Sequence, residues 1–203
     1  MIAIVDYGVG NLYSLYRSFE AIGASVKITA DEKELRDASH ILLPGVGAFS
    51  DAAKKLFDSG LALPVMEEAR KGKPLLGICL GMQMLLEKSY EYGEHKGLGL
   101  IPGQVRPISE VLPKGLKIPH IGWNALCFQG EKNRLFKYVH EGDCVYFVHS
   151  FHGTNCEDAV IATAEYGVPL TAAVAKENVW GCQFHPEKSG SVGLNILKAF
   201  LEA

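Results

Sequence analysis

The sequence predicts an α/β fold, a single domain over residues 1–203 with a mixed, mostly parallel central sheet flanked by helices. Two observations predict it. Short apolar runs alternate with runs of helical period through about the first ninety residues, which is typical of parallel strands covered by helices on both faces. From about residue 117 the runs become shorter, β-branched and aromatic, and turn residues separate them, which indicates antiparallel additions to the sheet.

Strands and helices alternate in the first half. We expect strands at 1–6, 25–29, 40–43 and 74–78, the first of them apolar and the last buried. We expect helices where apolar residues recur at helical spacing, at 11–22, 31–37, 48–70 and from Leu80 to about Lys88. Gly23 should end the first of these helices and Asp31 should cap the second. The third should be broken near Gly60 and Pro64.

The second half contributes strands from four further runs, at 144–148, 159–164, 171–175 and 179–184. An amphipathic helix is expected at 191–201. In sheets of this class the functional crevice lies at the C-terminal ends of the parallel strands. Cys79 and the turn 44–47 each follow a predicted strand, so both are expected at that crevice.

The composition argues against several classes of function. A net charge of −3 provides no basic surface for a nucleic acid. No run approaches the ~20 apolar residues that a membrane span requires, and residues 1–12 lack the features of a signal peptide. The five cysteines are odd in number and lack CxxC spacing, so we expect reduced thiols in a cytoplasmic protein.

No cofactor and no metal ion is expected. The first glycine-rich stretch carries Tyr13 where a dinucleotide fingerprint needs its third glycine. Cys182 and His185 should point to opposite faces of a strand, and so should His149 and His152, which argues against zinc at either pair.

Cys79 is the first candidate catalytic residue. It lies in Gly77-Ile78-Cys79-Leu80-Gly81, which has the pattern of a nucleophile elbow with cysteine in place of serine. The glycines relieve crowding at a sharp strand-to-helix turn. The turn would place the sulfur at a helix N-terminus, which favours the thiolate, and would free the Leu80 amide to donate to an oxyanion. A buried core cysteine between two packing glycines explains this stretch equally well.

His185 and Glu187 form the second candidate, in the run Gln-Phe-His-Pro-Glu that ends at Glu187. In extended backbone, residues two apart face the same side, so both side chains can turn toward one place. A carboxylate on one imidazole nitrogen fixes the tautomer, and the other nitrogen can then exchange a proton with a thiol. Together with an elbow cysteine, this pair favours nucleophilic catalysis over a histidine that simply ends a strand.

The turn Pro44-Gly45-Val46-Gly47 is the third candidate. Glycines on both sides of Val46 leave its peptides free to reorient. An amide of Val46 or Gly47, together with that of Leu80, could form a two-donor oxyanion hole. A plain strand-to-helix turn is the simpler interpretation of this stretch on its own.

These three pieces together resemble the class I (triad) glutamine amidotransferases, over essentially the whole chain. The match rests on Gly77 to Gln83 and on Gln183 to Glu187. The resemblance implies a flavodoxin-like core with the antiparallel additions. It also implies a catalytic triad of Cys79, His185 and Glu187 that hydrolyses L-glutamine to glutamate and ammonia through a γ-glutamyl thioester.

The resemblance also implies the substrate contacts. Gln83 lies one helical turn after Cys79 on the same face, so it should reach the bound glutamine. Glu91 corresponds to the position that holds the α-amino group of glutamine. The backbones of Ser150 and Phe151 correspond to the segment that holds its α-carboxylate. Taken alone, Glu91 would be interpreted as an ordinary charged surface residue.

Further stretches, above all Pro119-His-Ile-Gly-Trp-Asn124, resemble the family members that form a heterodimer with a (β/α)₈-barrel synthase subunit in histidine biosynthesis. They imply a partner interface and ammonia path at five positions: Asn11, Trp123, Asn124, Tyr146 and Lys188. Trp123 alone would be interpreted as a core residue. No barrel is expected within this chain, which ends at Ala203.

Two rival classes stay open. One is another enzyme on the same scaffold, either a cysteine peptidase or a glutaminase that serves anthranilate, GMP or pyridoxal phosphate synthesis. The other is a binding or regulatory module that keeps the fold without catalysis. Gln83, Glu91 and the stretch from Pro119 to Asn124 argue against the peptidase, and an intact triad argues against the module.

Overall fold

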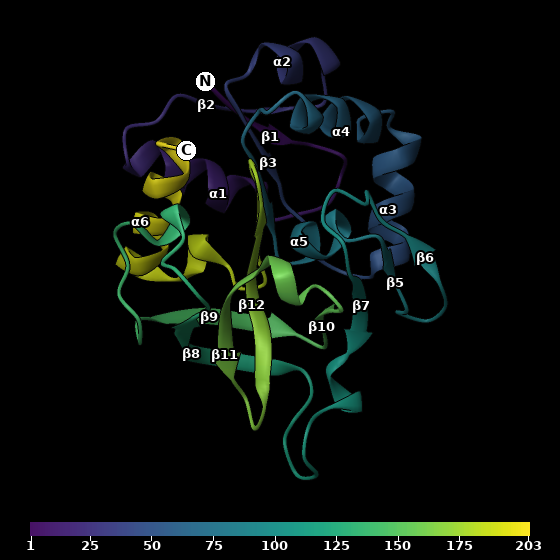
Figure 1. The fold of residues 1–203 in the computed structure, drawn as a ribbon. Coiled ribbons are helices and arrows are strands. Elements are labelled where there is room, and N and C mark those ends of the chain that lie inside the picture. Colours follow the sequence, from purple (N-terminus) through teal and green to yellow (C-terminus); the bar gives the residue numbers. More distant parts are fainter.

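The computed structural model describes residues 1–203 and contains one long mixed sheet with helices on both faces (Figure 1). The sheet has nine strands in the order β2-β1-β3-β4-β13-β12-β11-β8-β9. In chain order these are β1 (Ile2–Val5), β2 (Val26–Thr29), β3 (His40–Leu43), β4 (Leu75–Ile78), β8 (His120–Phe128), β9 (Cys144–His149), β11 (Val160–Glu165), β12 (Pro169–Lys176) and β13 (Val179–Cys182). The α/β class with a mixed sheet is confirmed.

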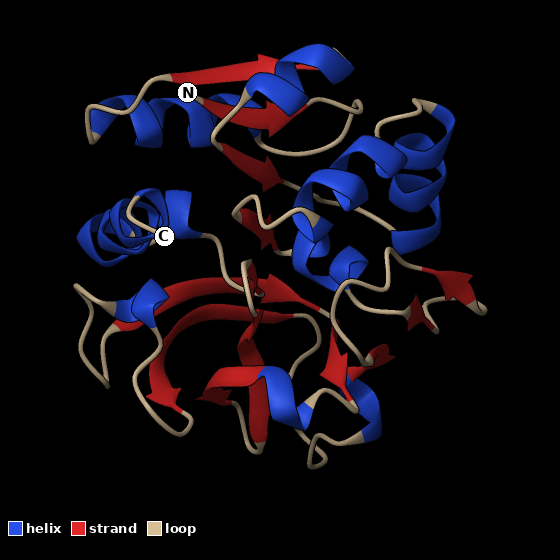
Figure 2. Cartoon of the chain, turned by 45° about the horizontal axis from the view of Figure 1, so that its top comes forward, coloured by secondary structure: helices blue, strands red, loops and turns tan.

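The helices form two layers, one on each face of the sheet, as Figure 2 shows. They are α1 (Leu12–Ala21), α2 (Glu32–Asp37), α3 (Phe49–Asp58), α4 (Ala62–Arg70), α5 (Leu80–Leu85) and α6 (Gly190–Leu201). Short 3-10 helices follow some strands: η1 (Ile108–Glu110), η2 (Arg134–Phe136), η3 (Glu157–Ala159) and η4 (Pro186–Lys188). None of the helices combines the length and the hydropathy of a bilayer span.

The two layers bury two separate apolar cores, and β1 explains why. Successive strand residues point to opposite faces, so Ala3 and Val5 pack with α2 to α5 while Ile2 and Ile4 pack with α1 and α6. All four residues are buried, and the same alternation continues through β3 and β4. A strand that is apolar at every position is therefore the correct pattern for the centre of this sheet.

Five strands of the sheet are parallel, one more than the sequence predicts. The run at 179–184 was expected among the antiparallel additions, but β13 pairs in parallel with β4, with Cys182 opposite Ile78. The change of direction comes one strand later, at β12, which is antiparallel to β13. A short tight turn joins β12 to β13, and this hairpin carries the chain back to the centre of the sheet.

Three smaller expectations are wrong. The predicted helix from Leu80 to Lys88 ends at Leu85, because Lys88 and Ser89 form strand β5. The helical stretch is broken near Gly60 as expected, between Asp58 and Ala62, but Pro64 is not part of the break, since it lies in the first turn of α4, where proline is tolerated. A second sheet, in the order β10-β7-β5-β6, was not predicted. Its strands are β5 (Lys88–Ser89), β6 (His95–Lys96), β7 (Gln104–Pro107) and β10 (Phe151–Thr154).

Candidate active site

Cys79 lies at a strained turn between β4 and α5. Its backbone has φ 54° and ψ −111°, a combination that residues with a side chain rarely adopt and that costs about 1–3 kcal/mol. A Cβ on Gly77 would lie 2.7 Å from the carbonyl carbon of Gly81. A Cβ on Gly81 would overlap the carbonyl oxygen of Leu43. Both glycines are therefore required because backbone packs against backbone at this turn.

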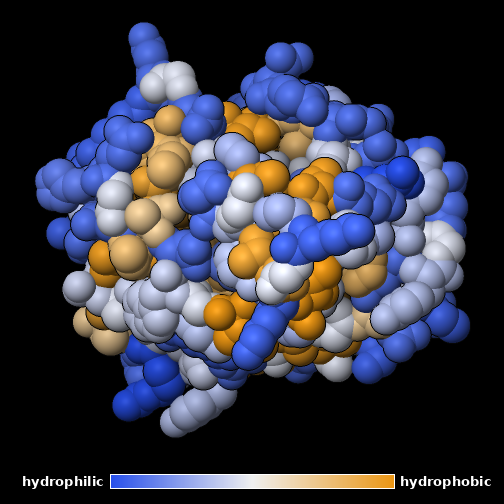
Figure 3. Space-filling view, turned by 90° about the horizontal axis from the view of Figure 1, so that it is seen from below, coloured by the Kyte–Doolittle hydropathy of each residue, from blue (hydrophilic) through white to orange (hydrophobic).

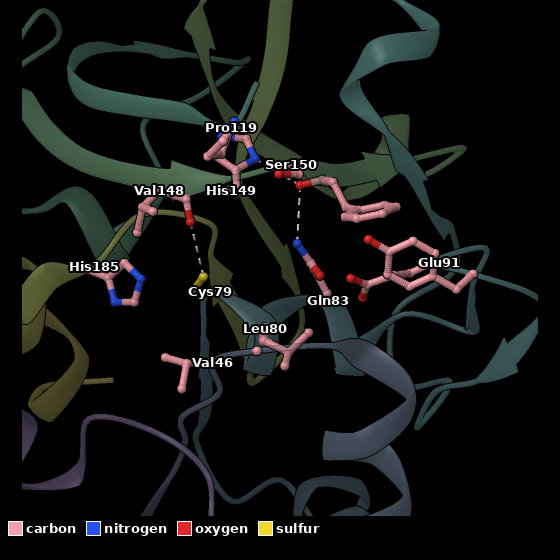
Figure 4. Close-up of a pocket in the computed structure, with 13 residues that line it drawn as sticks. Val46, Cys79, Leu80, Gln83, Glu91, Pro119, Val148, His149, Ser150 and His185 are labelled. Carbon is pink, nitrogen blue, oxygen red and sulfur yellow. Dashed lines mark hydrogen bonds between the residues drawn. The ribbon is translucent and has the colours of Figure 1, made fainter. Parts of the chain in front are cut away.

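The sulfur faces a cavity of about 360 Å³ at the C-terminal edge of the parallel strands (Figure 4). Sγ of Cys79 lies 4.0 Å from the carbonyl oxygen of Val148 and 3.7 Å from Nε2 of Gln183. His185 lines the same cavity, beside the sulfur. Cys79 is only 8% exposed, and a small ligand in the cavity can reach its sulfur.

His185 and Glu187 form a buried pair. Nδ1 of His185 lies 2.8 Å from Oε1 of Glu187, and both side chains are almost fully buried. We expected extended backbone through both residues, but Glu187 lies in the 3-10 helix η4, which still turns its carboxylate toward the ring. The His185 amide donates to the carbonyl of Tyr146 at 2.9 Å, which fixes the start of this turn.

The electrostatics of the pair favour a charged imidazole. Burial alone would lower the pKa of His185, but its interactions with Cys79 and Glu187 outweigh burial and raise that pKa to about 9. The ring can therefore hold a proton at neutral pH. Cys182, which precedes this segment, is fully buried in the core, and burial raises its thiol pKa well above the usual range. Cys182 is thus an unreactive packing residue.

Three backbone amides at the cavity have no acceptor in the protein. They belong to Val46, Gly47 and Leu80. The turn that carries the first two packs tightly against the elbow, because a Cβ on Gly45 would lie 2.7 Å from the amide nitrogen of Gly81. Figure 4 places Val46 and Leu80 on the same side of Cys79. Donors in this arrangement can stabilise negative charge on an oxygen beside the sulfur.

The opposite wall of the cavity carries polar groups that can hold a small zwitterion. Nε2 of Gln83 donates to the carbonyl oxygen of Phe151 at 3.2 Å and to Oε1 of Gln183 at 3.0 Å. Glu91 is only 8% exposed, so its interpretation as a surface residue is wrong. One of its oxygens accepts from the Phe49 amide at 2.7 Å, at the start of α3. Ser150 and Phe151 complete this wall.

A family model for class I glutamine amidotransferases, described as "Glutamine amidotransferase class-I", matches residues 3–203. The chain belongs to this family. Among relatives of this amidotransferase, "Imidazole glycerol phosphate synthase subunit HisH" of Caldanaerobacter subterraneus subsp. tengcongensis is 49% identical, covering 100% of this chain and 98% of the relative. The protein of the same name from Lactococcus lactis subsp. lactis is 48% identical, with 99% and 98% covered.

Solved structures agree on the fold of the amidotransferase. One described as "Crystal structure of glutamine amidotransferase" superposes with a TM-score of 0.77 at 18% identity, covering 100% of this chain and 98% of the other. "Structure of PurLQS from Thermotoga maritima" gives a TM-score of 0.72 at 22% identity, with 99% and 97% covered. At such identities the likeness shows the fold alone.

The surface residues of the amidotransferase fall into two groups. Trp123 and Tyr146 face each other across β8 and β9 with ring centroids 6.0 Å apart, and Nζ of Lys188 lies 5.8 Å from the Tyr146 centroid. Trp123 is 55% exposed, so its interpretation as a core residue is wrong. Asn124 is anchored by its side chain, whereas Asn11 begins α1 and makes no capping side-chain bond.

Apolar side chains gather on the face that Figure 3 views, the lower face of Figure 1, where β8 and β11 lie. On β8 and the segment before it, the exposed large apolar residues are Leu116, Ile118, Ile121 and Trp123. Contiguous apolar surface of this kind is typical of a protein interface.

Sequence reasoning did not place five further residues of the amidotransferase at the cavity. Tyr92, Pro119, Val148 and His149 line it, and Gln183 reaches the sulfur. Gln183 stands two residues before His185 in the same run. In extended backbone, residues two apart face the same side, and this rule could have revealed it. His149 was considered only as a zinc ligand. Its position at the end of β9, beside the elbow, depends on strand order, which the sequence does not provide.

Proposed function

We propose that this amidotransferase is the glutaminase subunit of imidazole glycerol phosphate synthase, acting in histidine biosynthesis with residues 1–203 as one catalytic domain. It hydrolyses L-glutamine and passes the ammonia to a synthase subunit that forms imidazole glycerol phosphate and aminoimidazole carboxamide ribonucleotide. The observation that carries the glutaminase activity is the strained Cys79 beside the buried His185–Glu187 pair in one cavity. The names of the full-length relatives support the pathway.

The reaction begins with a pair of opposite charges, the Cys79 thiolate and the His185 imidazolium. The sulfur attacks the side-chain amide carbon of glutamine, and the carbonyl oxygen becomes an oxyanion held by the amides of Leu80 and of Val46 or Gly47. His185 donates its proton to the amide nitrogen, and the C–N bond breaks. Ammonia departs, and the γ-glutamyl group remains bound to Cys79 as a thioester. Water then attacks the thioester while His185 accepts its proton, which releases glutamate and restores the thiolate.

Glutamine would be oriented by the opposite wall. The carboxylate of Glu91 suits the α-ammonium group, because the two charges are opposite and Glu91 is buried. Nε2 of Gln83 donates to two groups of the protein, so its Oε1 remains as an acceptor for the substrate. The backbones of Ser150 and Phe151 suit the α-carboxylate. These assignments rest on lining positions and charge.

The partner would be a (β/α)₈-barrel synthase subunit in a heterodimer, docked at the apolar surface around Trp123 and Tyr146 with Asn11, Asn124 and Lys188 beside it. Ammonia that reaches bulk water becomes protonated and ceases to be a nucleophile, so the two active sites should be connected by a protected path. A cytoplasmic location, consistent with five unpaired cysteines, belongs to the same proposal.

The deciding experiment measures glutamate release by the chain alone, and with a candidate synthase subunit and its nucleotide substrate. Release that depends on Cys79 and rises with the synthase supports the proposal. A glutaminase of anthranilate, GMP or pyridoxal phosphate synthesis would respond to its own synthase instead. No release with any synthase would favour a binding module, and cleavage of peptides would favour a cysteine peptidase. High activity in isolation, unchanged by the synthase, would reject activation of the glutaminase by the synthase subunit.

A further inference from the structure

A chain of four polar groups links the cavity to strand β8. Nδ1 of His149 lies 2.8 Å from the carbonyl oxygen of Phe151 on the cavity wall, and its Nε2 lies 3.0 Å from Nδ1 of His120. Nε2 of His120 lies 2.7 Å from Oδ1 of Asn124. Both rings are buried, and Phe147 and Tyr166 stack against His120. Each ring nitrogen therefore has a neighbour within the protein.

The orientation of the Asn124 amide is fixed by Glu165, a residue that is not one of these four groups. Its Nδ2 donates to the carbonyl of Glu165 at 2.8 Å, so its oxygen must face His120. The series of four hydrogen-bonding groups thus has an acceptor at both ends, the Phe151 carbonyl and the Asn124 amide oxygen. Three contacts each need one proton, but two neutral imidazoles carry only two.

Burial keeps both rings neutral. It lowers the pKa of His149 to about 3, although the hydrogen bond with Phe151 acts in the opposite direction, and it also lowers the pKa of His120. One of the three contacts must therefore lack its proton, and the tautomers decide which. If His149 carries its proton on Nδ1, the Phe151 carbonyl is held. If it carries the proton on Nε2, a nitrogen lone pair faces that carbonyl and repels it.

The Phe151 carbonyl matters to the cavity because Gln83 depends on it. The same oxygen accepts from Nε2 of Gln83 at 3.2 Å, and this contact helps to point Oε1 of Gln83 at the cavity (Figure 4). A displaced carbonyl would loosen the amide and allow it to turn its NH₂ toward the ligand. A positively charged ligand group would then meet donors in place of an acceptor.

We propose that His149 and His120 are positioning residues for glutamine hydrolysis, which hold the Phe151 carbonyl and so the acceptor face of Gln83, with Asn124 selecting their tautomer. The proposal rests on the proposed glutaminase function. Because Asn124 lies on the surface assigned there to the synthase subunit, a partner that draws the Asn124 oxygen away from His120 removes one acceptor. Two protons then satisfy both remaining contacts, and His149 donates to Phe151.

The test uses amide side chains that restore one imidazole nitrogen at a time. In His149→Asn the amide nitrogen stands near the position of Nδ1 and can still donate to Phe151, whereas in His149→Gln it stands near Nε2 and cannot. We expect KM for glutamine to rise about tenfold in His149→Gln and in His149→Leu, as for one lost hydrogen bond. His149→Asn should stay within about threefold of the unaltered chain, and kcat should change little in all three.

The matched control is His152→Leu, because His152 is equally buried but has no hydrogen-bond partner on either ring nitrogen. KM is measured on the chain assembled with its synthase subunit. Glutamine binding is measured by calorimetry in Cys79→Ala, so that the result does not depend on turnover. Equal KM values for the Asn and Gln variants would overturn the proposal, even if His149→Leu fails to fold. Absence of glutamine turnover in the unaltered chain and in His152→Leu would instead count against the glutaminase function.

Discussion

At the scale of single residues, Cys79 and Glu187 together determine the pH range in which His185 keeps its proton. The pKa of His185 is raised to about 9, so the imidazolium persists through neutral pH and is lost as the pH rises through that value. We expect kcat/KM for glutamine to decline on the alkaline side near pH 9. In Glu187→Gln this decline should move to lower pH, and turnover should fall by about 10²–10⁴-fold.

The pH profile of kcat/KM checks this expectation, with Glu202→Gln as the control. Glu202 also accepts hydrogen bonds, from Tyr138 and Lys137, but at the surface and away from the cavity. Its profile should match that of the unaltered chain. An unchanged alkaline limb in Glu187→Gln would mean that Glu187 does not act through the imidazole.

At the scale of structural elements, the junction of β4 and α5 depends on close backbone contact. Gly81→Ala places a Cβ where the Leu43 carbonyl oxygen stands, so α5 or the end of β3 must move. We expect loss of glutaminase activity together with a lower midpoint of thermal unfolding. Gly130→Ala is the control, because its Cβ would meet no atom and only its left-handed backbone is strained, at about 1–2 kcal/mol. Full activity in Gly81→Ala would contradict the tight elbow.

The helices α2 and α4 are joined through the buried carboxylate of Glu68. Lys71 and Lys73 lower its pKa to about 2, and Arg36 of α2 reaches it as well. Because the pKa is lowered on folding, the ionised carboxylate stabilises the fold at any pH above the ordinary pKa of a glutamate. This contribution is lost as the pH falls toward 2. Glu68→Gln should reduce the free energy of unfolding at neutral pH by about 1–3 kcal/mol.

Urea unfolding at neutral pH and near pH 3 measures this contribution. The difference between Glu68→Gln and the unaltered chain should narrow in acid, because near pH 3 the carboxylate of the unfolded chain is protonated while that of the folded chain is still mostly ionised. Glu32→Gln removes an exposed partner of the same Arg36 and should change stability by less than about 0.5 kcal/mol. A Glu68 effect that does not depend on pH would point to packing in place of charge.

Periodicity was a sufficient guide to the elements up to β4 but not to those that follow. β1, β3 and β4 are apolar at every position, and Asp31 caps α2 through its side chain, so local signals suffice there. The strands β5 and β6 contain two residues each, too few for any pattern. β13 is apolar like its neighbours, and only the whole arrangement determines that it pairs with β4.

At the scale of the whole molecule, we predict that the exposed apolar surface around Trp123 binds the second chain. Trp123→Ala should abolish co-purification with the synthase subunit, because large aromatic residues dominate such interfaces. The stability of the isolated chain should change little, since Trp123 is 55% exposed. Leu63→Ala is the control, because Leu63 is 63% exposed on α4. Undiminished co-purification of the Trp123 variant would place the interface elsewhere.

Four of the residues proposed for catalysis and substrate binding could be predicted from the sequence because they stand in two short runs. Cys79 and Gln83 stand in one run, and His185 and Glu187 stand in the other. The proximity of the two runs follows from β4 and β13 being neighbours, which no local pattern reveals. Their catalytic roles, and those of Val46, Glu91 and the surface residues, stay predictions until the variants are measured.

The pairing of β4 with β13 has a consequence for how such a protein can diversify. The Cys79 amide donates to the Cys182 carbonyl at 2.7 Å, so the sulfur and the imidazole are positioned by one ladder of main-chain bonds. Almost everything between these strands, from the second sheet to the exposed surface of β8, lies on a long excursion of the chain. The parts of that excursion away from the cavity can acquire new lengths and new partners, whereas the segments that carry Glu91, Tyr146 and Phe151 must keep their place beside the ladder.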